Sequence, residues 1–575
     1  MTRTWLCLAL LTSGVAVSEL SAQQRLPLKR APRPTTAAIT ESDLMTRLYI
    51  FADDSMQGRQ AGREGSRRGT EYIARELRRL GVEPAGDNGT YFQALPSVLR
   101  RFTDASTLSV NGRVLRWIED FVAVPGAVAP RPISAALVIY GGVAGDTTNQ
   151  ISAEAAAGKL VVLRPAPPGA GRGGRGGGGG GGRGGGGGAN ARFANAAALA
   201  TIDLQTLRPS ARALINNPMS AVSGTRATAP APAPSAGPAT LRITPEAAAM
   251  LLGRALEGMA PGTTGGTVDA RLEFVEQPVP EYARNVVGII RGSDPVLRNQ
   301  YVALGAHSDH VGFHGNPVNH DSARAFATEV LRIRMARGDL DTISAEQRAS
   351  IRVNVDSLRR IRPMRLDSIN NGADDDGSGS MALLEIAEAI TRASTKPRRS
   401  ILLVWHTAEE RGLLGANYFT ENPTVPRDSI VAHINMDMIG RGRTQDLPGG
   451  GPDYLAVVGS RRLSTELGDA VVAVNKKQKR PLALDYRFDE NIAEGRPGWA
   501  NYNNIYGRSD HARYARYNIP IAFFFTGLHQ DYHQVTDEPQ YIDYPHYTRI
   551  TNYIRDLVNE VANRDKRPVV DKATT

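Results

Sequence analysis

The chain has 575 residues, of which 41% are hydrophobic and 22% charged, which is the composition of a globular protein. A chain of this length is too long to fold around a single hydrophobic core, so we expect two or three domains. The formal net charge is +10, but there is no basic helix and no basic stripe with interleaved aromatic residues, so we expect no nucleic-acid partner.

The amino terminus predicts export. Arg3 precedes an apolar run from Trp5 to Val17, and small and polar residues follow to Ala22. This pattern is typical of a secretory signal peptide, so we expect residues 1–22 to be removed, leaving a periplasmic or secreted protein without stable membrane insertion. An uncleaved anchor is the alternative, although the run is short for a bilayer span. Cys7, the only cysteine, lies in this segment, which excludes thiol catalysis by the mature chain.

Residues 23–39 are rich in Pro, Arg and Thr and predict a flexible leader. Residues 40–95 are expected to form the first part of the main domain. They contain a helical pattern from Thr70 to Leu80, which Gly81 ends, and the preceding stretch "MQGRQAGREGSRRG" predicts a glycine-rich turn.

Residues 96–282 predict a second, β-rich unit. Short apolar runs such as "AALVIYGG" and "KLVVLRP" are separated by turn residues, as in strands. The tract 169–188 is almost entirely glycine and predicts a disordered loop. A phosphate-binding loop is the alternative, but the required spacing and following helix are missing.

Residues 283–575 predict an α/β domain with a mostly parallel, mixed sheet that helices cover on both faces. Near-continuous apolar strands alternate with helices, and such strands are buried on both sides. The predicted helices are Met381–Arg392 and Gly412–Phe419, and the predicted strands are 285–292, 301–307, 400–407, 430–438, 453–460 and 519–527.

Acidic residues and histidines follow these strands. In such sheets the ligand lies beyond the carboxyl ends of the strands, so distant motifs meet there. Any one motif alone would be a helix cap or a solvated turn, but together they supply the nitrogen and oxygen donors that zinc takes. Two zinc ions about 3.5–4 Å apart would need one bridging carboxylate. The candidate ligands are His307 in "GAHSDHVG", Asp375 in "GADDDGSG", Glu410 in "TAEERG", Asp437 in "INMDMIG" and His533 in "HQDYHQ".

These five motifs, in this order, resemble the co-catalytic di-zinc exopeptidases that include bacterial leucyl aminopeptidase, aminopeptidase Y and glutamate carboxypeptidase. The resemblance covers about Asn285 to the end, together with Met56–Leu80. The middle of the chain resembles the protease-associated domain that many members of this family carry as an insert. The family implies an aminopeptidase that removes amino-terminal residues from peptide substrates.

The resemblance also implies roles for individual residues. His307, Asp375 and Asp437 would hold one zinc ion, and Glu410, His533 and the shared Asp375 would hold the other. A cis peptide is expected between Asp375 and Asp376, which would support the metal site. Asp309 would orient His307, and Glu409 would be the general base.

The resemblance leaves the oxyanion donor open between two tyrosines. Tyr506 in "NNIYGRSDHARY" is preferred, because aminopeptidases of the family carry a tyrosine there. Tyr532 beside His533 is its competitor, because carboxypeptidase members use a tyrosine at that place. Four further histidines, His310, His314, His406 and His511, are expected to have supporting or structural roles. A charged, helical-looking insertion spans 319–366, and it either shapes the substrate entrance or is a surface addition.

Three other functions compete with the aminopeptidase. A carboxypeptidase or a glutaminyl cyclase-like enzyme would share the fold, but such cyclases usually manage with one zinc ion. A receptor-like binding module without catalysis is the third, but receptor-like relatives lose the metal ligands that this chain keeps.

Overall fold

The computed structural model describes residues 26–124, 129–144, 146, 148–165, 191–206, 222–225, 237–278, 283–337, 343–361, 363–488 and 505–572. The predicted signal peptide (1–22) and the glycine-rich tract (169–188) lie outside the described residues. Residues 26–39 form neither helix nor strand, yet they contact the main domain. The Thr35 hydroxyl donates to Glu388 at 2.6 Å, and the Tyr49 hydroxyl donates to the carbonyl of Pro27 at 2.6 Å.

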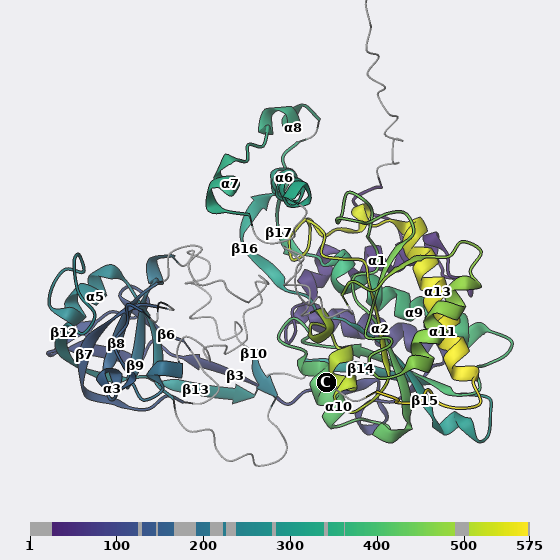
Figure 1. The fold of residues 1–575 in the computed structure, drawn as a ribbon, viewed down its shortest axis with the longest axis horizontal. Coiled ribbons are helices and arrows are strands. Elements are labelled where there is room, and N and C mark those ends of the chain that lie inside the picture. Colours follow the sequence, from purple (N-terminus) through teal and green to yellow (C-terminus); the bar gives the residue numbers. More distant parts are fainter. Residues whose placement is uncertain are drawn as a thin grey trace, which may run out of the picture.

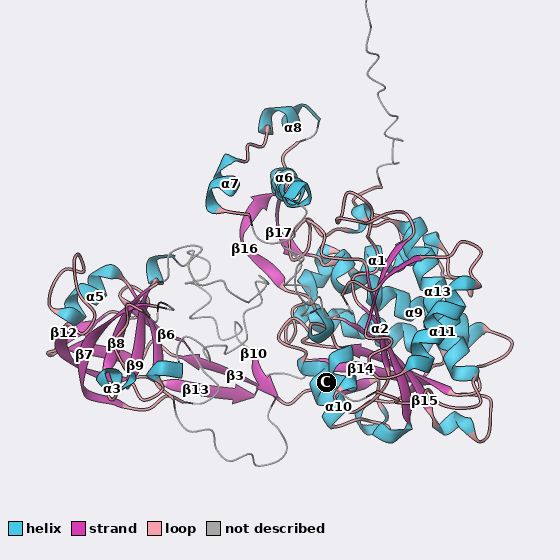
Figure 2. Cartoon of the chain, in the orientation of Figure 1, coloured by secondary structure: helices cyan, strands magenta, loops and turns pink. Residues whose placement is uncertain are grey.

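The main domain is built on a nine-stranded mixed sheet (Figures 1 and 2). Its centre consists of four parallel strands, and antiparallel strands flank them. Neighbouring parallel strands have their carboxyl ends at the same edge of the sheet, and the predicted metal ligands lie in the residues that follow these ends. The strands in spatial order are β1 (Glu83–Pro84), β14 (Arg284–Ile290), β18 (Ser400–His406), β15 (Tyr301–His307), β19 (Ile430–Met436), β22 (Ile521–Phe525), β20 (Tyr454–Val458) and β21 (Ala483–Asp485), with β2 (Phe92–Ala94) beside β14.

Helices cover both faces of this sheet, as the apolar strands predict. Along β18, Leu403 and Trp405 join one buried core, and Leu402 and Val404 join the other. The larger core also takes side chains from α1 (Glu41–Phe51), α2 (Glu64–Leu80), α9 (Gly379–Arg392), α11 (Thr465–Lys476) and α13 (Tyr544–Asn563), and the smaller one from α10 (Leu414–Glu421) and α12 (His511–Ala515). Within the described residues, no helix combines the length and the apolar character that crossing a lipid bilayer requires.

Helix α2 begins earlier than the sequence predicts. The predicted glycine-rich turn over residues 56–69 is correct only for its first half, because Glu64–Gly69 are already helical. The glycines there serve close packing: a Cβ at Gly65 would lie 2.2 Å from the carbonyl oxygen of Met56. A Cβ at Gly69 would lie 3.2 Å from the side chains of Phe51 and Arg59. The segment 54–59 therefore lies directly against the start of the helix.

A second sheet of eight strands, with its own hydrophobic core, lies apart from the main domain in Figure 1. The chain reaches it through β3 (Ser97–Phe102) and returns through β13 (Phe274–Pro278), and these two strands pair with each other and, through β3, with β10 (Val222–Thr225). Its resemblance to a protease-associated domain stays a prediction. In order the strands are β5 (Arg113–Leu115), β4 (Thr107–Val110), β12 (Thr264–Arg271), β7 (Ile133–Val143), β8 (Leu160–Arg164), β9 (Ala198–Ile202), β11 (Ala239–Ile243) and β6 (Phe121–Val124), with helices α3 (Ala153–Ala156) and α5 (Pro245–Leu252).

The insertion between the first two motifs projects from the main domain on a two-stranded ribbon (Figure 1). Arg365 pairs with Glu538 at 2.8 Å, and the guanidinium of Arg324 lies 3.5 Å from the ring centre of Tyr541. These contacts fix the base of the insertion to the loop that follows His533. The ribbon consists of β16 (Gly312–Asn319) and β17 (Leu366–Asn370), and it carries α6 (His320–Arg337), α7 (Ala345–Ser350) and α8 (Val355–Ile361).

We expect Gly65→Ala to lower the free energy of unfolding by about 2 kcal/mol, because the steric conflict with Met56 outweighs the better helix propensity of alanine. Gly451→Ala is the control, since a Cβ there meets no atom within 4 Å, and we expect it to be nearly neutral. Urea unfolding of both variants measures the difference. If the two variants had equal free energies of unfolding, the packing of residues 54–59 against helix α2 would tolerate an added methyl group at position 65.

Candidate metal centre and active site

The predicted ligands converge at the carboxyl edge of the central strands. His307 is the last residue of β15 and lies in register with His406, the last residue of β18. Glu410 follows β18, and Asp437 follows β19 directly. Asp375 enters from the loop before α9. The parallel register thus brings residues from four separate motifs to one place.

His307, Asp375 and Asp437 form the first donor group. Nε2 of His307 lies 3.1 Å from Oδ1 of Asp375 and 3.6 Å from Oδ1 of Asp437. All three residues are buried. Their ligand atoms lie within 4.8 Å of one another, so one ion can contact all of them.

A second donor group shares Asp375. Nε2 of His533 lies 3.0 Å from Oδ2 of Asp375 and 2.9 Å from Oε2 of Glu410. His310 joins this group, with Nδ1 2.9 Å from Oε1 of Glu410. Asp375 therefore offers one oxygen to each group, which is the arrangement of a bridging carboxylate.

The donors fit divalent metal ions of the zinc type. Imidazole nitrogens and carboxylate oxygens are the ligands that zinc takes together with thiolates. Nε2 of His307 and Nε2 of His533 are buried and have no hydrogen-bond partner, and neither has Oδ2 of Asp375. Buried polar atoms are normally satisfied, so these atoms require a further partner. A bound cation supplies one.

The electrostatics of the two groups also favour a cation. Burial would raise the pKa of Asp375, but His307 and His533 beside it hold that pKa well below its ordinary value. Burial lowers the pKa of His533, and Glu410 and Asp375 more than offset it, raising that pKa to about 10. Asp375 thus stays ionised and attracts positive charge, for which protons and metal ions compete.

Asp309 and Asp376 lie against the predicted ligands, and their supporting roles stay predictions. Oδ2 of Asp376 accepts from the backbone N–H of His307 at 3.0 Å, and Oδ1 accepts from that of Met438 at 3.1 Å. The Asp375–Asp376 peptide is cis, as expected. Nδ1 of His307 contacts the backbone carbonyl of Asp309 at 3.0 Å, whereas the carboxylate oxygen Oδ1 of Asp309 lies 3.7 Å away. That oxygen accepts from the backbone N–H of Glu409 at 3.0 Å.

Sequence reasoning missed the carboxylates beneath Asp375. Asp537 accepts from the backbone N–H groups of Asp374 and Asp375, each at 3.0 Å. Asp374 in turn accepts from Gly440 at 2.7 Å and lies 3.1 Å from Nε2 of His529. The signal was present in "HQVTDEP", where Asp537 follows His533 by four residues, but a carboxylate in a turn does not by itself indicate this role.

Arg59 was missed as well. It is fully buried, and its guanidinium donates to the carbonyls of Asn371 at 2.6 Å, Gly372 at 2.8 Å and Ser308 at 3.2 Å. One side chain therefore holds both the loop of His307 and the loop of Asp375. Its position in "MQGRQAG" gave only a turn prediction from sequence.

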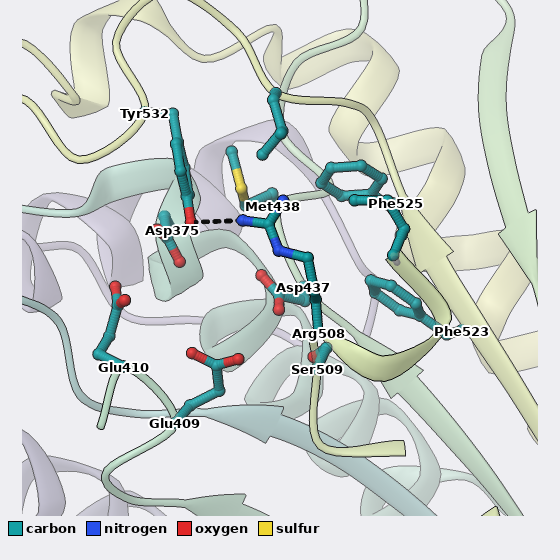
Figure 3. A pocket seen from close by; sticks show the side chains of 12 residues that line it. Asp375, Glu409, Glu410, Asp437, Met438, Arg508, Ser509, Phe523, Phe525 and Tyr532 are labelled. Carbon is teal, nitrogen blue, oxygen red and sulfur yellow. Dashed lines mark hydrogen bonds between the residues drawn. The ribbon is translucent and has the colours of Figure 1, made fainter. Parts of the chain in front are cut away.

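A pocket opens beside the metal donors (Figure 3). Four carboxylates line it, those of Asp375, Glu409, Glu410 and Asp437. Tyr532 also lines it, and its hydroxyl accepts from Nη2 of Arg508 at 3.2 Å. The rest of the wall is Ser509 and five apolar side chains, Met438, Ile505, Phe523, Phe525 and Leu528.

Tyr506 is not among the residues that line this pocket. Its ring lies 4.0 Å from the guanidinium carbon of Arg462 and 5.6 Å from the ring centre of His511.

The histidines that the sequence sets aside have different positions. His406 lies 3.3 Å from Asp510, and His314 lies on β16, so neither belongs to a donor group in the described chain. Among the four histidines set aside from sequence, the structure brings only His310 to the metal donors.

The fold and the site define the chain as an α/β protein with a candidate two-metal centre at the carboxyl edge of its sheet. Residues 285–558 match the family model of Peptidase family M28. These residues make up just under half of the chain and carry both donor groups, so this domain is similar to that family.

Curated relatives match part of this domain. Leupeptin-inactivating enzyme 1 of Streptomyces exfoliatus is 29% identical over 178 residues, covering 30% of this chain and 34% of that protein. Leucine aminopeptidase 1 of Penicillium rubens is 28% identical over 183 residues, covering 30% and 43%. The chain thus matches less than half the length of either relative. Among solved structures, BSAP, a zinc aminopeptidase from Bacillus subtilis, is 14% identical over 94% of this chain and 99% of that one, with a TM-score of 0.47.

We expect Arg59→Met to lower the free energy of unfolding by about 3 kcal/mol or more, because four buried carbonyls, those of Phe51, Ser308, Asn371 and Gly372, lose their donor. The same variant is expected to retain less zinc after dialysis, since both metal-bearing loops lose a common support. Arg68→Met is the matched control: Arg68 is exposed and pairs with Glu64, so its loss costs at most about 1 kcal/mol. Urea unfolding and elemental analysis give both quantities. Normal stability and metal content in Arg59→Met would contradict the assigned role.

Proposed function

We propose that this protein is an exported aminopeptidase that binds two zinc ions and removes amino-terminal residues from peptides. The observation that carries the proposal is the pair of donor groups that share Asp375, with Glu409 beside them. Similarity to Peptidase family M28 and the leucine aminopeptidases among its relatives support peptide hydrolysis from the amino terminus. His307, Asp375 and Asp437 would hold one ion, and Asp375, Glu410 and His533 the other. The export rests on the amino-terminal pattern of the sequence alone.

Glu409 is proposed as the general base. It lines the pocket next to the ligand Glu410 but belongs to neither donor group, so its carboxylate is available for protons. Zinc ions held by the donors would lower the pKa of a bound water and polarise the scissile carbonyl. Glu409 would accept the proton of the attacking water and pass it to the leaving amine. The hydrogen bond from its backbone to Asp309 fixes the residue for this task.

For the oxyanion donor, the position in the pocket favours Tyr532 over Tyr506. Burial raises the pKa of Tyr532 well above its ordinary value, so the hydroxyl keeps its proton. That hydroxyl already accepts from Arg508, which leaves its own proton free to be donated. We infer that Tyr532 donates to the carbonyl oxygen as negative charge develops on it.

The apolar wall of the pocket favours substrates with an apolar terminal side chain. Phe523, Phe525 and Met438 lie beside the carboxylates (Figure 3), so a leucine-sized side chain would lose contact with water there. A carboxypeptidase is the second candidate, because Arg508 also lines the pocket and a guanidinium binds a terminal carboxylate well.

Glu409→Gln is expected to keep both zinc ions and to lower kcat for leucyl-p-nitroanilide by about 10³-fold, because the base is removed while the ligands remain. Glu421→Gln, at the exposed end of α10, is the control and is expected to act as wild type. Elemental analysis and initial rates are measured on the same samples.

The same assay distinguishes the two candidate peptidases. Acetylation of the substrate amine abolishes hydrolysis by an aminopeptidase and spares a carboxypeptidase. Cleavage of N-acetylated dipeptides, with no cleavage of leucyl-p-nitroanilide, would therefore replace the proposal by the carboxypeptidase. Folded protein that retains no zinc and has no activity on either substrate would favour a binding module.

Tyr532→Phe is expected to lower kcat by about 10²- to 10³-fold with little change in KM, because the lost hydrogen bond forms chiefly in the transition state. Tyr506→Phe is the matched comparison and is expected to stay within about threefold of wild type in kcat. The reverse ranking of the two variants would restore Tyr506 as the oxyanion donor.

A further inference from the structure

The two donor groups differ in size. The group around His307 has three residues, whereas the group around Glu410 and His533 has four, because it includes His310. His310 is 1% exposed, and neither of its ring nitrogens has a hydrogen-bond partner. This histidine has no role in the function proposed above.

The distances within the larger group are those of a coordination shell. Around a tetrahedral zinc ion with bonds near 2.0–2.1 Å, donor atoms lie about 3.3 Å apart. Nδ1 of His310 lies 2.9 Å from Oε1 of Glu410 and 3.7 Å from Oδ2 of Asp375. Nε2 of His533 lies 2.9 Å from the other carboxylate oxygen of Glu410, Oε2, and 3.0 Å from Oδ2 of Asp375. His310 is therefore placed much as His533 is.

The backbone around His310 is built to hold its ring in this position. Its N–H donates to the carbonyl of Arg59 at 3.2 Å. On the other side lies Gly372, with a positive φ of 56°, and a Cβ there would come within 2.5 Å of Cγ of His310. Only glycine leaves room for the ring at this point. Two separate segments thus fix the imidazole against Glu410.

We propose that His310 is a fourth protein ligand at the Glu410–His533 position, which makes the two halves of the centre unequal. The inference rests on the two-zinc site of the proposed function. The four-donor position is closed by protein and holds its ion more tightly. The position at His307, with three protein donors, keeps a coordination place for water or substrate, which is how structural and catalytic zinc sites differ.

The test counts imidazole ligands in full-length protein loaded with one equivalent of zinc. His310→Asn is the informative variant, because the asparagine side-chain amide can donate to Glu410 but is a poor zinc ligand. His314→Asn is the control, since His314 lies on β16 outside both donor groups. Zinc X-ray absorption gives the number of imidazoles, and competition with a chromophoric chelator gives the Kd of each site.

We expect two imidazole ligands per zinc ion in the wild type and in His314→Asn, and one in His310→Asn. In His310→Asn the Kd of the tighter site is expected to rise at least about tenfold, because one direct ligand of the zinc ion is lost. One imidazole in the wild type, or two in His310→Asn, would overturn the proposal and leave His310 as a buried neighbour of Glu410 that binds no metal. Folded wild type that binds no zinc would instead refute the proposed function itself, so the two failures are distinct.

Discussion

The shared carboxylate of Asp375 is the constraint on which the rest of the main domain depends. Its two oxygens face different histidines, His307 at 3.1 Å and His533 at 3.0 Å, and no other residue of the two donor groups belongs to both. A displaced Asp375 would separate the donors into two incomplete sites. Its loop is accordingly held from beneath by Asp537 and from the side by Arg59.

Burying so many carboxylates at one place is costly unless positive charge compensates them. The protein supplies part of that charge through histidines and buried arginines. Arg441 shows the pattern: it is buried and pairs with Asp446 at 2.7 Å and with Asp531 at 3.1 Å, next to the loop of His533. Within the described residues, the donor carboxylates of the centre pair with histidines and with no arginine. Bound metal ions would complete the compensation of these charges and would tie folding of the loops to metal binding.

The sequence predicted those parts that follow from local patterns. Apolar strands buried on both faces gave the sheet and its helices, and carboxyl edges of parallel strands placed His307 and Asp437 together. What it missed depends on packing between distant segments. Helix α2 begins early because Gly65, which has no side chain, lets the backbone of Met56 pack against the start of the helix. Such a contact between segments cannot be predicted from the spacing of apolar residues. His310 joined the donors because Gly372 makes room for its ring, and Tyr532 rather than Tyr506 lines the pocket.

Crystallographic zinc anomalous scattering from zinc-loaded protein would locate each ion relative to the two oxygens of Asp375. We expect two peaks, each about 2.0–2.2 Å from a different oxygen of that carboxylate. One peak lies on the side of His307, and the other lies on the side of His533. A single peak, or two peaks that Asp375 does not bridge, would contradict the proposed sharing of Asp375.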